Sequence, residues 1–388
     1  MSEWKEYKLG DIAEVVSDRV SISKATLDNY ISTENMINDF GGVMKAEKLP
    51  IATSVNSFNQ NDILFSNIRT YFKKVWLSKF NGTVSPDVLV FKARENKCIS
   101  AHLYYSLCNP DFTEYSVLTS KGAKMPRGDK DALLNFIISL PPLPEQTAIA
   151  SVLSSLDNKI DLLHRQNATL EKMAETLFRQ WFVEEAKEEW EMGKLGDVLH
   201  SIESGSRPKG GIDPALNVGI PSIGAESING IGNYNFSKTK FITMEFFKKM
   251  KRGIIEDYDV LIYKDGAYVG RKGMFGKGFP FKECSVNEHV FILRTNEKLN
   301  QIFLYFLLQE DELAQLNANS AQPGLNQEAM KSFEIVIPPR EKLVDFEKIV
   351  KPWVDKIFFN STQIRTLTAL RDTLLPKLMS GEVKVEMN

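Results

Sequence analysis

The chain has 388 residues, of which 43% are apolar and 25% charged, and its formal net charge is −2. This length exceeds what one hydrophobic core usually fills, so we expect two domains. No stretch reaches the ~18 to 20 uninterrupted apolar residues of a membrane span, and the opening MSEWKEYKLGD is too polar for a signal peptide. These features, together with three cysteines that lack paired spacing, predict a cytoplasmic protein without a disulfide framework.

The chain repeats itself once along its length. The pattern W-x-x-x-K-L-G-D at residues 4–11 returns at residues 190–197, an offset of 186. The run FIISLPP at residues 136–142 returns as FEIVIPP at residues 333–339, an offset of 197. The second copy therefore carries 11 extra residues near its start. A fixed offset over most of the chain indicates a tandem duplication.

Each copy divides into a mixed part and a helical part. Short apolar runs such as DVLVFK and HVFILR, set between clusters of Gly, Asn, Asp and Pro, are typical of strands, whereas ISAHLYYSLCN and LNQIFLYFLLQEDELAQL are typical of helices. The mixed part predicts an α/β globule of about 150 residues. The predicted domains are a first globule at 1–144, a first helix at 145–187, a second globule at 188–340, and a second helix with a C-terminal tail at 341–388.

The two helical parts carry the same apolar spacing, alternately four and three residues, which predicts a coiled-coil seam. Asn167, Asn360 and Arg371 interrupt the seam; a polar residue there can fix the register, and fraying near helix ends would explain them equally well. Pro352 and Pro376 predict a kink near the start of the second helix and an end near Leu375. The predicted seam residues are Ile149, Leu153, Leu156, Ile160, Leu163, Leu170 and Leu177 in the first helix, and Val350, Trp353, Ile357, Ile364, Leu367 and Leu374 in the second.

Two seams in one chain most simply pack on each other. The ends of a domain usually lie close together, so the second helix should start where the first one stops, which predicts an antiparallel pair. A helix of ~40 residues would hold two globules roughly 50 to 60 Å apart. The predicted fold is thus two α/β globules, related by a pseudo-two-fold axis, at opposite ends of a long antiparallel two-helix coiled coil. Duplex DNA presents paired half-sites with the same symmetry.

Basic residues gather in loops that are rich in Gly and Asn, although the net charge is slightly negative. Such loops suit contacts with DNA, because Lys and Arg neutralise phosphates while Asn, Gln and Arg can also bind base edges. For any one of these residues the alternative is a solvated surface charge, and we expect that of about half. The candidates are Asn67, Arg69, Tyr71, Lys73, Lys74, Lys121, Lys124, Arg127 and Lys130 in the first globule, and Ser204, Ser206, Arg207, Lys209, Lys264, Tyr268, Arg271, Lys272, Asn319 and Gln322 in the second.

The sequence offers no site for catalysis or for a metal. An adenine methyltransferase needs an aromatic Pro-Pro motif and a Gly-rich turn, but CNPDF at 108–112 has one proline, and GRKGMFGKG at 270–278 matches neither a dinucleotide nor a phosphate loop. The four histidines are scattered without the spacing of zinc ligands. We therefore expect a binding protein with no catalytic residues, no metal and no cofactor of its own.

Several motifs resemble one known family. PPLPEQ followed by the helix IASVLSSLDNKIDLLHRQNATLEKMAETLF, its shortened counterpart PPREKLV, and the closing LLPKLMSGEV are similar to the specificity subunit of type I restriction-modification enzymes. The resemblance covers the whole chain. It departs from the family pattern at PPREKL, where the second copy lacks equivalents of Leu143, Pro144 and Gln146, so both helix starts need not dock partners identically.

The resemblance implies a non-catalytic subunit with two target recognition domains, each reading half of a bipartite double-stranded DNA target. The coiled coil would set the gap and dock two methyltransferase subunits, which methylate adenine N6 with S-adenosylmethionine. Restriction subunits that translocate and cut DNA with ATP and Mg would join them. A stand-alone DNA-binding adaptor or regulator of the same architecture is the alternative. A fused methyltransferase or nuclease lacks its motifs, and a purely structural coiled coil would leave the basic globules without a purpose.

Overall fold

The computed structural model describes residues 4–266, 269–309, 313 and 324–386, and the chain forms two compact units. Unit 1 combines Met1–Lys159 with Leu367–Asn388, and unit 2 is Ile160–Thr366. Both unit boundaries fall inside long helices, whereas the predicted domains kept the helices separate. The physical reason is that each half of a long helix contributes side chains to the core of a globule.

Unit 1 contains two four-stranded sheets, ordered β2-β9-β6-β7 and β3-β5-β8-β4, and a β1-β10 ladder. The predicted strand DVLVFK forms most of β9, in which every residue is buried except half-buried Leu89 and exposed Lys92. The strands are β1 (Lys5–Lys8), β2 (Ala13–Val16), β3 (Arg19–Ser21), β4 (Tyr30–Ile31), β5 (Ser54–Phe58), β6 (Ile63–Ser66), β7 (Val75–Leu77), β8 (Gly82–Val84), β9 (Val88–Ala93) and β10 (Ile137–Leu140). The short helices are α1 (Leu9–Ile12), η1 (Ile22–Lys24), η2 (Thr70–Phe72), α2 (Ser100–Cys108), α3 (Pro110–Leu118) and α4 (Lys130–Leu134).

Unit 2 repeats this plan with a five-stranded sheet, β12-β19-β16-β17-β14, a three-stranded sheet, β15-β13-β18, and a β11-β20 ladder. Its strands are β11 (Glu191–Lys194), β12 (Leu199–Ser204), β13 (Ile220–Ile223), β14 (Gly230–Ile231), β15 (Lys240–Ile242), β16 (Val260–Tyr263), β17 (Lys272–Met274), β18 (Ser285–Val286), β19 (Val290–Thr295) and β20 (Glu334–Ile337). Its short helices are α6 (Leu195–Val198), η4 (Ala225–Ser227), η5 (Phe236–Lys238), α7 (Met244–Lys249), α8 (Gln301–Leu307) and α10 (Gln327–Ser332).

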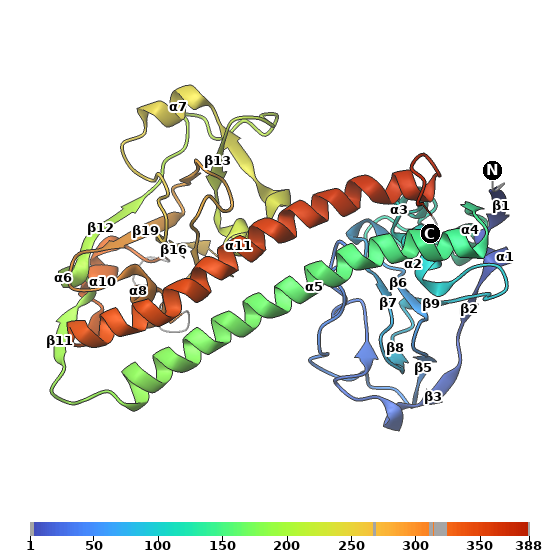
Figure 1. Cartoon of the computed structure of the whole chain (residues 1–388), viewed down its shortest axis with the longest axis horizontal. Coiled ribbons are helices and arrows are strands. Elements are labelled where there is room, and N and C mark those ends of the chain that lie inside the picture. Colours follow the sequence, from blue (N-terminus) through green and yellow to red (C-terminus); the bar gives the residue numbers. More distant parts are fainter. Residues whose placement is uncertain (1–3, 267–268, 310–312, 314–323, 387–388) are drawn as a thin grey trace. The chain divides into compact units, whose positions relative to one another are not determined.

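Two long helices, α5 (Leu143–Arg179) and α11 (Arg340–Met379), complete both units (Figure 1). Alpha-helix α5 continues into a π-helical turn, η3 (Gln180–Glu184). In unit 1, Ile149 of α5 shares a hydrophobic core with Leu378 near the end of α11. In unit 2, Phe178 near the end of α5 lies 6.1 Å, between ring centroids, from Phe346 near the start of α11. The helices therefore run antiparallel within each unit, which confirms the predicted pairing.

The seam is buried as its spacing predicts. All thirteen predicted seam residues are buried or half-buried, and Leu153, Leu163, Val350 and Ile357 are almost fully so. Asn360, whose residue is fully buried, donates a hydrogen bond from Nδ2 to Asn167 Oδ1 at 2.8 Å. These two residues lie far from the helix ends, so fraying does not explain them. They form a polar contact between the helices within unit 2.

The second helix continues beyond Leu375, contrary to the prediction, and ends at Met379. Pro376 stands in the final turn of α11, where the missing N–H leaves one carbonyl, that of Asp372, without its helical partner. Asp372 is exposed, so water can satisfy that carbonyl. Helix α11 also continues without a break through Pro352.

The two helix starts are fixed by different side chains, which accounts for the departure at PPREKL. In unit 1, buried Gln146 accepts a hydrogen bond from Ile99 N at 3.1 Å and donates to Lys97 O at 2.9 Å. In unit 2 the equivalent residue is Leu343, and Asn300 donates from Nδ2 to its carbonyl at 3.1 Å. The side chain that makes these hydrogen bonds thus belongs to the long helix in unit 1 and to the facing loop in unit 2. No helix among the described residues is long and apolar enough to cross a membrane.

Candidate nucleic-acid interface

Two basic segments that are distant in the sequence meet in unit 1. Residues 67–74 and 121–130, here called the first loop pair, are joined by a β-bridge between Ile68 and Arg127. Arg69 donates its backbone N–H to Pro126 O at 2.8 Å, and Gly128 donates to Asn67 O at 3.0 Å. The two predicted clusters of cations therefore form one surface.

The same contact recurs in unit 2 at the repeat offset. Leu325 donates its backbone N–H to Lys264 O at 2.5 Å, and these residues lie 197 positions after Gly128 and Asn67. Residues 264–272, as far as they are described, and 324–325 are here called the second loop pair. The pairing is thus a property of the duplicated fold rather than of either sequence. Tyr268, Asn319 and Gln322 were also predicted to contact DNA and lie outside the described residues.

A third loop, which precedes β9 or β19, supports each loop pair. Asn67 donates its backbone N–H to Asp87 O at 2.8 Å, and Lys264 donates to His289 O at 3.0 Å. In unit 1 this loop also binds a cation, because Arg127 Nη2 lies 2.6 Å from Asp87 Oδ1. The sequence analysis missed Asp87, although its place just before a buried strand marked it as the end of a loop.

In unit 2 the third loop is acidic and ties two predicted segments together. Glu288 Oε1 lies 2.9 Å from Arg207 Nε, in the segment that follows β12. His289 Nδ1 lies 2.8 Å from Asp265 Oδ1 in the second loop pair. Arg207 and Lys209 are exposed, and Ser204 and Ser206 are half-buried beside them. Glu288, Asp265 and His289 were missed because the prediction considered cations and uncharged hydrogen-bonding side chains, and not the acidic residues or the histidine beside them.

The predicted cations of the first loop pair differ in exposure and in pairing. Lys124 and Lys130 are exposed, and the Tyr71 side chain is also exposed. Lys73 Nζ lies 3.9 Å from Asp39 Oδ1, a distance at which the pair is loose. Lys121 forms an ion pair with Asp129, and the hydrogen bond between them raises the pKa of Lys121. This surface can offer several positive charges to a polyanion.

Three predicted DNA contacts face the protein interior instead. Lys74 donates from Nζ to Thr33 O at 2.5 Å, and burial lowers the pKa of its amine. Lys272 donates to the carbonyls of Tyr305 at 2.8 Å and Leu308 at 2.7 Å, so it satisfies the end of α8. The Asn67 residue is 8% exposed. Lys74 and Lys272 thus bind carbonyl groups within the protein, a structural role that the sequence analysis did not predict for them.

The remaining predicted residues of unit 2 lie on the surface of the second loop pair. Lys264 is half-buried, with its Nζ 5.2 Å from the centroid of the Phe291 ring. Arg271 is half-buried, and its carbonyl accepts a hydrogen bond from Tyr263 N at 2.8 Å. Within the described ranges, no group of three or more His, Cys, Asp or Glu side chains is placed to hold a metal ion.

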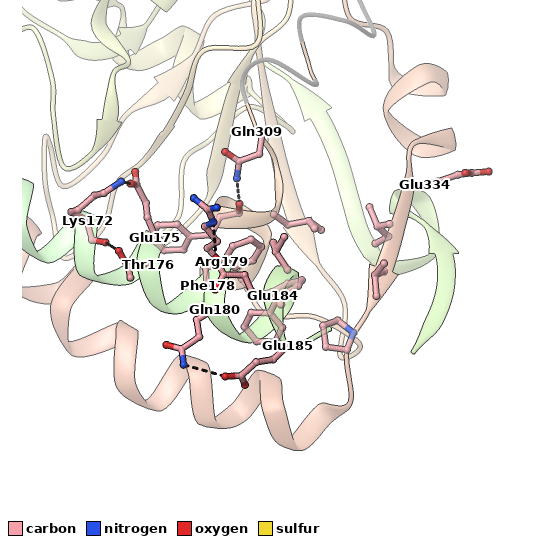
Figure 2. A pocket seen from close by; sticks show the side chains of 18 of the residues that line it. Lys172, Glu175, Thr176, Phe178, Arg179, Gln180, Glu184, Glu185, Gln309 and Glu334 are labelled. Carbon is pink, nitrogen blue, oxygen red and sulfur yellow. Dashed lines mark hydrogen bonds and ion pairs between the residues drawn. The ribbon is translucent and has the colours of Figure 1, made fainter. Parts of the chain in front are cut away.

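A separate groove of about 1090 Å³ lies in unit 2 beside the end of α5, between this helix, α8 and β20 (Figure 2). Its floor is apolar and includes Phe178 and Phe306, and Val183 stands at its edge with 61% of the residue exposed. Its rim is polar: Arg179 Nε lies 3.0 Å from Glu184 Oε1. An apolar groove with a charged rim fits a protein partner better than a nucleic acid.

Comparisons with known proteins agree on one family. The model of the "Type I restriction modification DNA specificity domain" matches residues 1–172 and 187–368. The specificity subunit of the type I restriction enzyme MjaIX of Methanocaldococcus jannaschii is 30% identical over 310 residues, which is 74% of this chain and 70% of the relative. The HindI specificity subunit of Haemophilus influenzae is 24% identical over 463 residues, covering 99% of this chain and 100% of that protein.

A solved structure supports the same fold. The crystal structure of the type I restriction-modification S subunit from M. genitalium superposes with a TM-score of 0.62 at 16% identity, covering 100% of this chain and 97% of that chain.

Proposed function

Because this chain belongs to the family of the type I restriction modification DNA specificity domain, we propose that it is the DNA-specificity subunit of a type I restriction-modification enzyme. Each unit reads one half of a bipartite target. The observation that supports this most directly is the loop pair that recurs in both copies, joined by Gly128 N to Asn67 O and by Leu325 N to Lys264 O. Two copies of one surface in a single chain suit a target made of two parts.

The chemistry of the loops supports duplex DNA as the ligand. Exposed Lys124, Lys130 and Lys209 can neutralise phosphates and fix the position of the duplex without reading its sequence. Arginines held by a carboxylate, Arg127 at Asp87 and Arg207 at Glu288, keep free N–H groups for a base edge.

The long helices set the gap between the half-sites in this proposal. Helix α5 has 37 residues and α11 has 40, and an α-helix rises ~1.5 Å per residue. Deleting seven residues from each should shorten the preferred gap by roughly 10 Å, or about three base pairs. An unchanged gap would show that the helices do not set it.

This chain contributes no catalytic group in the proposal; its partners do the chemistry. Methyltransferase subunits would methylate adenine N6 with S-adenosylmethionine, and restriction subunits would use ATP and Mg. The methyltransferase docks on the exposed apolar side chains along α5 and its π-helical turn, among them Met173 and Val183, the second of which lines the groove. Met173→Asp with Val183→Asp should abolish co-purification of the methyltransferase and leave DNA binding by the chain intact.

Co-expression with the methyltransferase subunit, followed by mapping of N6-methyladenine across the host genome, tests the function. We expect methylation at a split motif with a constant gap. A chain that binds DNA but neither retains a methyltransferase nor directs methylation would be the stand-alone adaptor instead.

A further inference from the structure

The loop that enters the first loop pair contains two residues in an unusual backbone conformation. Arg69 has φ 50° and ψ 59°, and Lys73 has φ 52° and ψ 44°, on either side of the short helix η2. In this left-handed region the Cβ of an L-residue crowds the backbone, so glycine is the residue normally found there. A long side chain at such a position makes the folded chain less stable. It is therefore expected to be retained only where the conformation has a function.

The second copy has glycine at both places. The residues 197 positions later are Gly266, with φ 74°, and Gly270, with φ 87°. The left-handed backbone is therefore a shared requirement of the duplicated loop, and glycine meets it at the lower cost. The arginine and the lysine are peculiar to the first copy and are not needed to shape the loop.

Residues 67–70 also contain buried polar side-chain atoms for which the described part of the chain provides no hydrogen-bond partner. Asn67 Oδ1, Arg69 Nε and Thr70 Oγ1 are buried, and none has a hydrogen-bond partner among the described residues. Buried polar atoms are nearly always paired, so three orphans in one short segment need an explanation. A ligand that offers hydrogen-bond acceptors would satisfy the Arg69 donor and the Thr70 hydroxyl.

The backbone of this segment, in contrast, is firmly held. Arg69 donates its N–H to Pro126 O at 2.8 Å, Lys73 donates to Thr70 O at 2.9 Å, and Phe40 donates to Lys73 O at 3.0 Å. The side chains of Arg69 and Lys73 therefore extend from a fixed backbone. A fixed backbone with unpaired side-chain groups is what a preorganised binding loop requires.

We propose that Arg69 and Lys73 bind hydrogen-bond acceptors on the DNA duplex, and that their left-handed backbone is retained because it aims these two side chains at the duplex. This rests on the proposed function. The acceptors are phosphate oxygens or the O6 and N7 atoms of guanine, which share the chemistry that a guanidinium and an ammonium recognise.

Glycine substitution separates this role from a structural one. The variants are Arg69→Gly, Lys73→Gly and the double variant, each made in the full chain together with its methyltransferase subunit. The matched control is Asn61→Gly, because Asn61 also has a left-handed backbone, with φ 71°. Asn61 lies before β6, whereas Arg69 lies after it. Stability is measured by urea unfolding, and affinity by anisotropy of a fluorescent duplex that contains the mapped motif.

The single variants Arg69→Gly, Lys73→Gly and Asn61→Gly should each be at least as stable as the parent. The double variant should lose at least fivefold in affinity for the duplex, whereas Asn61→Gly should stay within twofold of the parent. An affinity loss below fivefold in the double variant would overturn the proposal. So would a loss of stability on replacing Arg69 or Lys73 by glycine, because the side chains would then be holding the fold.

Two further readouts identify the acceptor. Loss of a phosphate contact should reduce the slope of log affinity against log salt by about 1 per contact, while the methylated motif stays the same. Loss of a base contact should leave the slope unchanged and make one half of the mapped motif degenerate. If the parental complex neither bound a duplex nor methylated a defined motif, the proposed function itself would fail; a parent that does both, beside an unaffected double variant, refutes only this inference.

Discussion

Arg371 of α11 donates a hydrogen bond from Nη1 to Asp157 Oδ1 of α5 at 3.0 Å inside unit 1. Tyr105 donates to the other oxygen of the same carboxylate at 2.8 Å. Burial on its own would lower the pKa of Arg371, but hydrogen bonds to Asp372 and Asp157 hold that pKa above its usual value. Burial and the neighbouring Asp157 charge raise the pKa of Tyr105, so its hydroxyl remains a donor. The three side chains form one polar layer between the helices and α2.

The duplication supplies an apolar version of this layer in unit 2. By the repeat offset Asp157 corresponds to Val354 and Arg371 to Ala174, and alignment of α2 with α8 pairs Tyr105 with Phe306. All three equivalents belong to one hydrophobic cluster. The architecture therefore does not require the polar layer, and we expect its three side chains to depend on one another.

The first prediction follows from this comparison. Arg371→Ala should destabilise the chain by about 2 to 4 kcal/mol, because it leaves a partly buried carboxylate without its cation. The triple variant Tyr105→Phe, Asp157→Val, Arg371→Ala reproduces the layer of unit 2 and should return to within about 1 kcal/mol of the parent. Urea unfolding measures both. A triple variant no more stable than Arg371→Ala alone would show that the two layers are not interchangeable.

Periodicity predicted the helices and their pairing because burial of an apolar stripe depends on local spacing, which the sequence displays directly. The periodicity of apolar residues could not predict the loop pairs. Arg69 N–H meets the carbonyl of Pro126, a contact between backbone atoms of distant segments that no side-chain pattern encodes. Lys73 and Lys74 are neighbours of the same type, yet Lys74 binds Thr33 O and Lys73 keeps a largely open ammonium. Only the course of the backbone separates these two roles.

The second prediction tests whether Lys272 has a structural role or contacts DNA. Lys272→Met removes the ammonium that binds the carbonyls of Tyr305 and Leu308, and it should cost about 1.5 to 3 kcal/mol of stability, as expected for hydrogen bonds to a charged group. Affinity for the duplex should be unchanged under conditions in which the variant is folded. Exposed Lys209 is the matched control: Lys209→Met should weaken DNA binding and change stability by less than about 0.5 kcal/mol. The reverse pattern would restore Lys272 as a DNA contact.

The third prediction concerns the helix starts. Gln146→Leu copies Leu343 but leaves Ile99 N–H and Lys97 C=O without the partners that Gln146 supplies, and it should cost about 2 to 4 kcal/mol in urea unfolding. Adding Ile99→Asn copies Asn300, whose Oδ1 accepts from Phe303 N at 2.7 Å and caps α8. The double variant should recover at least about 1 kcal/mol. If the double variant recovered no stability, the hydrogen bonds of Gln146 in unit 1 and of Asn300 in unit 2 would not be equivalent.

The fourth prediction is a pH dependence that comes from His102 in α2. This residue is fully buried, and both ring nitrogens lack a partner among the described residues. Burial lowers the pKa of His102 to about 4 from an ordinary value of 6.5. Between these values the unfolded chain binds a proton that the folded chain does not, so stability falls as the pH is lowered from 6.5 towards 4, by up to about 3 kcal/mol. Above pH 6.5 the residue is neutral in both states and contributes no such slope.

Its equivalent in unit 2 is Phe303, a buried aromatic residue of the core, which supplies the test. His102→Phe should be more stable than the parent at pH 7, because two unpaired polar atoms are removed, and the gain should widen as the pH falls to 5. His102→Gln separates the two effects: it keeps a buried polar group, so it should gain nothing at pH 7, yet it should lose the same part of the pH slope. Urea unfolding at pH 7, 6 and 5 measures all three proteins. A His102→Phe variant with the full parental slope would place the responsible proton elsewhere.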